Sequence, residues 1–147
     1  METTVVLESA EDEVRGVMAT WLAAARAKDV AGVMGCYAAD VVSYDAIGAL
    51  RFVGADALGE HWAACMAMDG EMQLTLRDLR VETAGPLAFC HFLMDCAGTG
   101  PDGTPHACTL RGTSCLRHEA GRWRIAHDHC SAPFDPMTMR ALDRAPE

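Results

Sequence analysis

Apolar side chains recur at intervals of three and four residues along the first part of the chain. Over residues 9–28 they form one stripe, which consists of Val14, Val17, Met18, Trp21, Leu22 and Ala25. This spacing predicts an amphipathic helix, with Ser9 as its N-cap and Asp12 as a weak capping-box partner. A second, short helix is predicted after Asp29, which can cap it, with Tyr37 at the end of its buried face.

From residue 71 onward the helical period gives way to alternation of apolar and polar positions, which is typical of strands. Strands are predicted at 72–83, 87–97, 106–118 and 122–131. The turns between several of them are short, so neighbouring strands should pair as antiparallel hairpins.

Between these two regions, a short strand is predicted at 41–46 and a third helix at 54–69. Val41, Ser43 and Asp45 would share one face of that strand. Helices followed by antiparallel strands indicate an α+β fold, in which a curved sheet can wrap around the helices and leave a pocket. We expect a single domain over residues 1–147, with its core at about 10–136.

Composition and charge exclude several functional classes. The 147 residues are the length of one domain, and the formal net charge of -9 argues against nucleic-acid binding, which needs a basic patch. No apolar run reaches the roughly 18 residues of a membrane span, and the start of the chain lacks the basic residues of a secretory signal. We therefore expect a cytoplasmic protein. The seven cysteines are odd in number and include no C-x-x-C pair, which favours reduced thiols.

Asp45 is the first candidate for chemistry. It follows an apolar strand, so it can point from a strand edge into the expected pocket. A carboxylate in half-apolar surroundings can have its pKa raised towards a value useful for a general base. The alternative is a solvated aspartate that helps to form the turn before Gly48.

His91 and Arg111 lie on neighbouring predicted strands, on faces that we expect to turn towards the pocket. Arg111 lies in a mostly apolar stretch, which suggests that it binds an anionic ligand group or an internal carboxylate. The alternatives are a hydrogen-bonded core histidine and a surface arginine near the start of its strand.

His127 and His129 are two residues apart on the last strand, so alternation places both on the face of Trp123 and Ile125. Together with His91 they could ligate a metal. Because such a pair needs no metal to be stable, we expect polar or structural roles in the pocket and no metal site.

Apolar residues are abundant along the predicted sheet. They include Met72, Leu74, Leu76, Cys90, Phe92, Met94 and Leu116. We expect them to be too many for one side of one core, which would leave an apolar outer face. Such faces usually mark interfaces, so the sequence predicts a homodimer.

The order of elements and several segments resemble the nuclear-transport-factor-2-like (cystatin-fold cone) superfamily, in its SnoaL-like and ketosteroid-isomerase-like branch. The matching segments are MATW at 18–21, KDV at 28–30, YAADVVSYD at 37–45, FVGADAL at 52–58, HW at 61–62, GRWRIAHDHCS at 121–131 and PFD at 133–135. The resemblance covers about residues 10–136 and implies a cone of helices on a curved sheet. It says little about function, because this fold hosts enzymes, binding proteins and assembly domains.

The resemblance also implies roles for individual residues. Asp45 matches the carboxylate base of the ketosteroid-isomerase branch. Trp21 and Thr113 stand where that branch has its oxyanion donors, a tyrosine and an aspartic acid, and are weaker donors than these. His91 stands where the related kinase association domain has a pocket arginine.

Two functional classes follow. The first is a cofactor-independent enzyme of the SnoaL-like type, an isomerase, cyclase or dehydratase that transfers a proton at carbon. Asp45, His127 and His91 are its catalytic candidates; those for substrate contact are Trp21, Tyr44, Trp62, Arg111, Thr113 and His129. The ligand would be a small hydrophobic molecule with a polar or anionic group. The alternative is a non-catalytic ligand-binding or assembly domain, favoured by the loss of the family's oxyanion donors.

Overall fold

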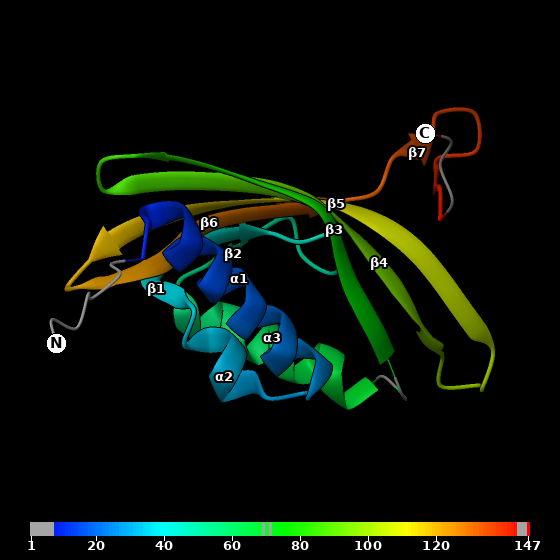
Figure 1. Cartoon of the computed structure of the whole chain (residues 1–147). Coiled ribbons are helices and arrows are strands. Elements are labelled where there is room, and N and C mark those ends of the chain that lie inside the picture. Colours follow the sequence, from blue (N-terminus) through cyan, green and yellow to red (C-terminus); the bar gives the residue numbers. More distant parts are fainter. Residues whose placement is uncertain (1–7, 69, 71, 144–146) are drawn as a thin grey trace, which may run out of the picture.

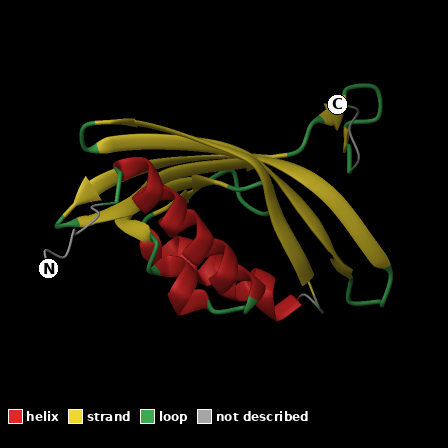
Figure 2. Ribbon diagram, in the orientation of Figure 1, coloured by secondary structure: helices red, strands yellow, loops and turns green. Residues whose placement is uncertain are grey.

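The computed structural model describes residues 8–68, 70, 72–143 and 147, and within them three helices lie in the hollow of one curved sheet (Figures 1 and 2). The helices are α1 (Ala10–Arg26), α2 (Val30–Met34) and α3 (Ala55–Met68). The strands of the large sheet are β1 (Tyr37–Tyr44), β2 (Phe52–Val53), β3 (Met72–Ala84), β4 (Leu87–Thr99), β5 (Pro105–Glu119) and β6 (Arg122–Ser131). A short hairpin, β7 (Phe134–Asp135) and β8 (Arg140–Ala141), follows. The expected α+β cone is confirmed.

The strands lie in the order β2-β1-β6-β5-β4-β3. All neighbours are antiparallel except β1 and β6, which pair in parallel. This crossover places β1, the first described strand of the chain, beside β6, the last long strand. Residues about 85 positions apart in sequence therefore meet under the helices, as between Ser43 and Asp128.

The predicted helix caps are present. The Ser9 hydroxyl accepts a hydrogen bond from the Asp12 amide at 3.1 Å, and the Asp29 carboxylate accepts one from the Gly32 amide at 3.0 Å. Each satisfies an amide that the first helical turn leaves without a partner. The prediction for Tyr37 is wrong: this buried residue begins β1 instead of ending the second helix.

The concave face of the sheet holds more apolar residues than the sequence suggested. Of the seven residues that were expected to be too many for one core, Leu74, Cys90, Phe92 and Leu116 are buried in it. The other three, Met72, Leu76 and Met94, pack against it. They all fit because their side chains point to the same face of the sheet. Leu74 pairs with Cys96 across β3 and β4, and Leu76 pairs with Met94. The expectation that these residues are too many for one core is wrong. The argument for a homodimer that was based on this expectation therefore does not hold.

An irregularity in β6 changes which of its residues face the helices. Leu116 pairs with Ile125 and the adjacent Cys115 pairs with His127, so β6 has one extra residue, Ala126, at this point. Such a bulge reverses the alternation beyond it. His127 and His129 therefore do not share the face of Ile125, contrary to the prediction.

We predict that Gly112→Ala destabilises the fold. Gly112 pairs with Phe92 across β4 and β5, and a Cβ atom at residue 112 would lie 2.2 Å from Cε2 of the Phe92 ring. Displacing that buried ring should lower the free energy of unfolding by about 1–3 kcal/mol in urea titrations. Gly16→Ala is the matched control: its Cβ in α1 would have nothing within 4 Å, so it should raise that free energy by about 0.5–1 kcal/mol. Equal effects of the two substitutions would contradict the prediction.

Candidate functional site

A cavity of about 160 Å³ lies between the concave face of the sheet and the helices α1 and α3. Three aromatic residues form part of its wall: the Trp21 and Trp62 rings meet edge to face at 5.7 Å between centroids, and Phe92 lies 6.5 Å from Trp21. Most of the remaining wall is apolar, with Leu58, Met72, Leu74, Met94 and Leu110 among its residues. A mostly apolar cavity with few polar groups is the usual form of a small-molecule site.

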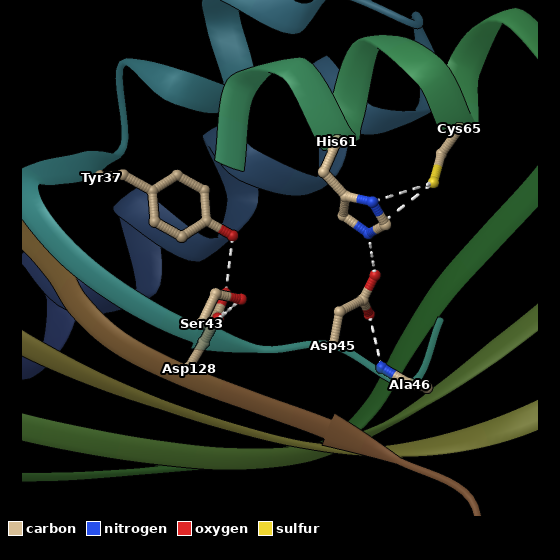
Figure 3. Close-up of polar contacts among 7 residues, drawn as sticks. All are labelled: Tyr37, Ser43, Asp45, Ala46, His61, Cys65 and Asp128. Carbon is tan, nitrogen blue, oxygen red and sulfur yellow. Dashed lines mark hydrogen bonds and ion pairs between the residues drawn. The ribbon is translucent and has the colours of Figure 1, made fainter. Parts of the chain in front are cut away.

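Asp45 and His61 form one polar group of this wall (Figure 3). Asp45 directly follows β1, and His61 lies on α3, where Nε2 is 2.5 Å from Asp45 Oδ2. The Ala46 amide donates to the other carboxylate oxygen at 2.8 Å. The Phe52 ring stacks on the imidazole with centroids 4.0 Å apart. These contacts fix both the carboxylate and the imidazole at the cavity wall.

Asp128 is the centre of a second polar group beside the first (Figure 3). Its carboxylate accepts hydrogen bonds from the Tyr37 hydroxyl, at 2.7 Å, and from the Ser43 hydroxyl. The Trp21 indole N–H in turn donates to the Tyr37 oxygen at 3.1 Å. Burial raises the pKa of Asp128, although the two hydroxyl donors oppose this, and the nearby Asp45 carboxylate raises it further.

Cys65 adds a thiol to the first polar group. It lies one helical turn after His61 on α3, and its Sγ atom is 3.8 Å from both ring nitrogens of His61. Carboxylate, imidazole and thiol thus follow one another along the cavity wall (Figure 3). This arrangement can hold a proton or pass it between neighbouring groups.

The structure brings three of the predicted site residues together at the cavity: Asp45, Trp21 and Trp62. For Asp45, the shared face with Val41 and Ser43 was predicted correctly, because both of these are buried. The Trp21 N–H, however, is engaged by Tyr37, so it does not point into the cavity as a vacant oxyanion donor.

The other predicted site residues lie elsewhere. His91 and Arg111 are exposed, because their buried neighbours in sequence, Phe92 and Gly112, take the concave face. The expectation that they share a pocket with Asp45 is therefore wrong. Alternation correctly divided the residues of each strand between two faces, but the face that meets the helices is the one without His91 and Arg111.

Thr113 and His129 border the cavity only in part. Each of these residues is exposed, and its two neighbours in sequence line the cavity, as Gly112 and Ser114 do on either side of Thr113. Their side chains therefore point to the outer face, and their main chain contributes to the wall. Thr113 is not placed to donate to a ligand through its hydroxyl.

His127 and Tyr44 also lie on the outer face. His127 Nδ1 is 2.6 Å from the Val42 carbonyl oxygen. The Tyr44 ring meets the His127 ring edge to face at 4.9 Å between centroids and the His129 ring at 5.6 Å. The β6 bulge is the physical reason, since it turns Asp128 inward in place of its two histidine neighbours.

Sequence reasoning missed the roles of His61, Tyr37, Ser43, Asp128 and Cys65. Two signals were present: His61 and Cys65 follow the buried Leu58 at helical spacing, and Ser43 was already placed on the face of Asp45. Asp128 had no such signal, because the bulge that turns it inward depends on pairing between distant strands.

Two negative findings concern the described part of the chain. It contains no group of three or more His, Cys, Asp or Glu side chains arranged to hold a metal ion. None of its helices combines the length and the hydropathy that a membrane span requires.

Known proteins resemble this chain in both sequence and structure. The family model described as the SnoaL-like domain matches residues 14–135. A nuclear-transport-factor-2-like protein of unknown function from Pseudomonas putida is 40% identical, with a TM-score of 0.86 over 94% of this chain and 96% of that chain. No curated protein matches the chain.

Two further solved structures show the fold alone. A ketosteroid isomerase-like protein from Erwinia carotovora is 22% identical, with a TM-score of 0.74 over 85% of this chain and 97% of that chain. A nuclear transport factor 2 superfamily protein from Salmonella enterica is 17% identical, with a TM-score of 0.77 over 86% and 92%.

We predict that Asp128→Asn changes the pH dependence of stability. Because burial raises the pKa of Asp128 above its ordinary value of 3.8, the folded protein binds this proton more tightly than the unfolded chain. Its contribution to stability is therefore present below 3.8 and is lost as pH rises through the raised pKa. Asparagine does not ionise, so the variant should gain stability relative to the parent protein across this window. Urea titrations between about pH 3.5 and pH 7 measure this difference in stability. A difference that stays constant or falls as pH rises would contradict a raised pKa of Asp128.

We also predict that iodoacetamide modifies Cys65 before Cys90, Cys96 and Cys130. Burial raises the pKa of Cys90 to about 11 and those of Cys96 and Cys130 to about 12, which leaves very little reactive thiolate near neutral pH. The Cys65 thiol has an imidazole beside it that can accept its proton. Mass spectrometry of peptides after timed alkylation gives the order of modification.

The control for this experiment separates the imidazole from simple exposure. His61→Gln should slow alkylation of Cys65, whereas Glu60→Gln, a substitution of an exposed neighbour on α3, should leave the rate unchanged. Equal rates in both variants would mean that access alone governs the thiol.

Proposed function

The chain belongs to the SnoaL-like domain family, and we propose that it is a small-molecule enzyme that transfers a proton at carbon without a cofactor. The observation that carries the proposal is the Asp45–His61 pair, 2.5 Å apart at the wall of a mostly apolar cavity. A fixed carboxylate beside bound substrate is the essential requirement for removing a proton next to a carbonyl group.

In the proposed reaction, the Asp45 carboxylate takes a proton from the carbon next to a ligand carbonyl. The electron pair of the broken C–H bond moves into the carbonyl group and produces an enolate. The imidazole of His61 orients the carboxylate and can carry the proton before it returns to carbon. Return to a different carbon gives an isomerisation, and loss of a neighbouring hydroxyl group as water gives a dehydration.

The enolate oxygen needs hydrogen-bond donors, and the Asp128 group is the best candidate. The hydroxyl groups of Tyr37 and Ser43, which both contact Asp128, lie at the cavity wall. Hydroxyl donors placed where negative charge develops can stabilise an oxyanion. These residues take the role that Trp21 and Thr113 were expected to have.

One observation favours the alternative of a non-catalytic ligand-binding domain. Among the described residues, every buried side-chain nitrogen or oxygen atom already has a hydrogen-bond partner. Tyr37 and Ser43 both donate to Asp128 in this state, so catalysis would require at least one of them to turn towards the ligand. A binding domain would require no such change.

The homodimer and the cytoplasmic location stay predictions. The outer face of the sheet exposes apolar side chains, with Tyr44 at 39% and Phe89 at 46% of their full exposure. They support a contact between copies through this face, although they are not the residues from which the sequence predicted it.

We predict that Asp45→Asn and His61→Gln both slow deuterium exchange at carbon. The assay follows uptake of deuterium from heavy water into cyclohexanone by proton magnetic resonance, which detects enolate formation directly. Loss of the base should reduce the rate by about 10²–10⁴-fold, and loss of the orienting imidazole by a smaller factor. Asp78→Asn and His106→Gln, two exposed positions outside the cavity, are the matched controls. Unchanged exchange in Asp45→Asn would refute the proposed base.

A further inference from the structure

From the dimensions and charges of the cavity, we infer that its ligand is a neutral molecule with a single six-membered ring and one carbonyl oxygen. The inference rests on the proposed function and narrows it to a class of substrate. It excludes the larger ring systems of steroids, and it excludes the anionic group that the sequence had suggested.

The size of the ring follows from the volume. The cavity measures about 160 Å³, and an engineered protein cavity of about 150 Å³ binds benzene. Cavities for drug-sized ligands measure about 300–1,000 Å³. The edge-to-face pair of Trp21 and Trp62 and the nearby Phe92 ring provide flat apolar walls suited to one ring. A four-ring steroid would leave most of its surface outside.

The absence of a ligand charge follows from the groups around the cavity. Among the residues that the structure describes, no Lys or Arg lines the cavity, and Arg111, the expected anion partner, is exposed on the outer face of the sheet. An anionic ligand would face the carboxyl groups of Asp45 and Asp128 with no arginine or lysine from the described residues to balance its charge, which is costly in apolar surroundings.

A cationic ligand is also poorly matched, because both carboxyl groups already have partners. Asp45 is paired with the His61 imidazole and the Ala46 amide, and Asp128 accepts hydrogen bonds from Tyr37 and Ser43. A ligand ammonium group would lose its hydration in this mostly apolar cavity and would meet carboxyl groups that already accept two hydrogen bonds each.

The position of the single oxygen follows from the two polar groups of Figure 3. The hydroxyl groups of Tyr37 and Ser43 are the donors that can turn to a carbonyl oxygen, and Asp45 is the base beside them. A ring ketone can present its oxygen to the donors and the adjacent carbon to Asp45. The rest of the ring then contacts the apolar wall.

The test compares probes that share one ring and differ in charge. Binding of cyclohexanone, cyclohexanecarboxylate and cyclohexylamine is measured by calorimetry, and a four-ring steroid enone is added as a competitor. We expect cyclohexanone to bind at least about tenfold more tightly than either charged probe, a difference of about 1.4 kcal/mol. The steroid should not displace it.

A pair of variants locates the binding. Leu110→Phe adds volume inside the cavity and should weaken cyclohexanone binding at least about tenfold. Leu93→Phe adds the same ring on β4, where alternation with the buried Phe92 places it on the outer face, and should leave binding unchanged. Equal effects of the two variants would overturn the inference.

Failure of the inference and failure of the proposed function give different results. Cyclohexanone binding without deuterium exchange would refute the enzyme and leave the ligand class intact. Asp45-dependent exchange on the steroid would keep the enzyme and overturn the ligand class. Tight binding of either charged probe, or no binding of cyclohexanone, would also overturn the inference.

Discussion

The parallel pairing of β1 with β6 is the constraint on which the candidate site depends. Asp128 of β6 is a partly buried carboxyl group, and such a group is costly unless it is hydrogen-bonded. Its partners, Tyr37 and Ser43, both come from β1. The same pairing places Asp45, the residue that follows β1, under α3 and within reach of His61. A change in the register of this one strand pair would separate both polar groups at once.

The periodicity of the sequence was sufficient to predict most of the fold. The four long strands and the long helices follow from simple alternation and from one apolar stripe, and the two predicted caps, Ser9 and Asp29, are observed. Asp45 could be predicted because the alternation from Val41 onward is regular and local. Each of these inferences uses residues that are close in sequence.

The remainder of the site depends on distant pairing, which one sequence does not reveal. Alternation grouped His91 with its neighbours correctly, but both faces of β4 carry apolar residues, so the sequence could not indicate which face meets the helices. For His127 and Asp128 the decisive feature is the extra residue at Ala126, which exists only relative to β5. Sequence patterns therefore predicted that Asp45 lies at the cavity, and did not predict the groups around it.

The site also depends on how α3 is held. Leu58 is the only buried residue of this helix, all of which the structure describes, whereas His61, Trp62 and Cys65 are only partly buried along the cavity. The core between α1 and the long strands is more fully buried, because Met18, Leu116 and Ile125 are each almost completely shielded from solvent. Because few buried contacts hold α3, the Asp45–His61 bond and the contents of the cavity contribute to its position. Ligand binding and the geometry of the proposed base are thus physically coupled through this helix.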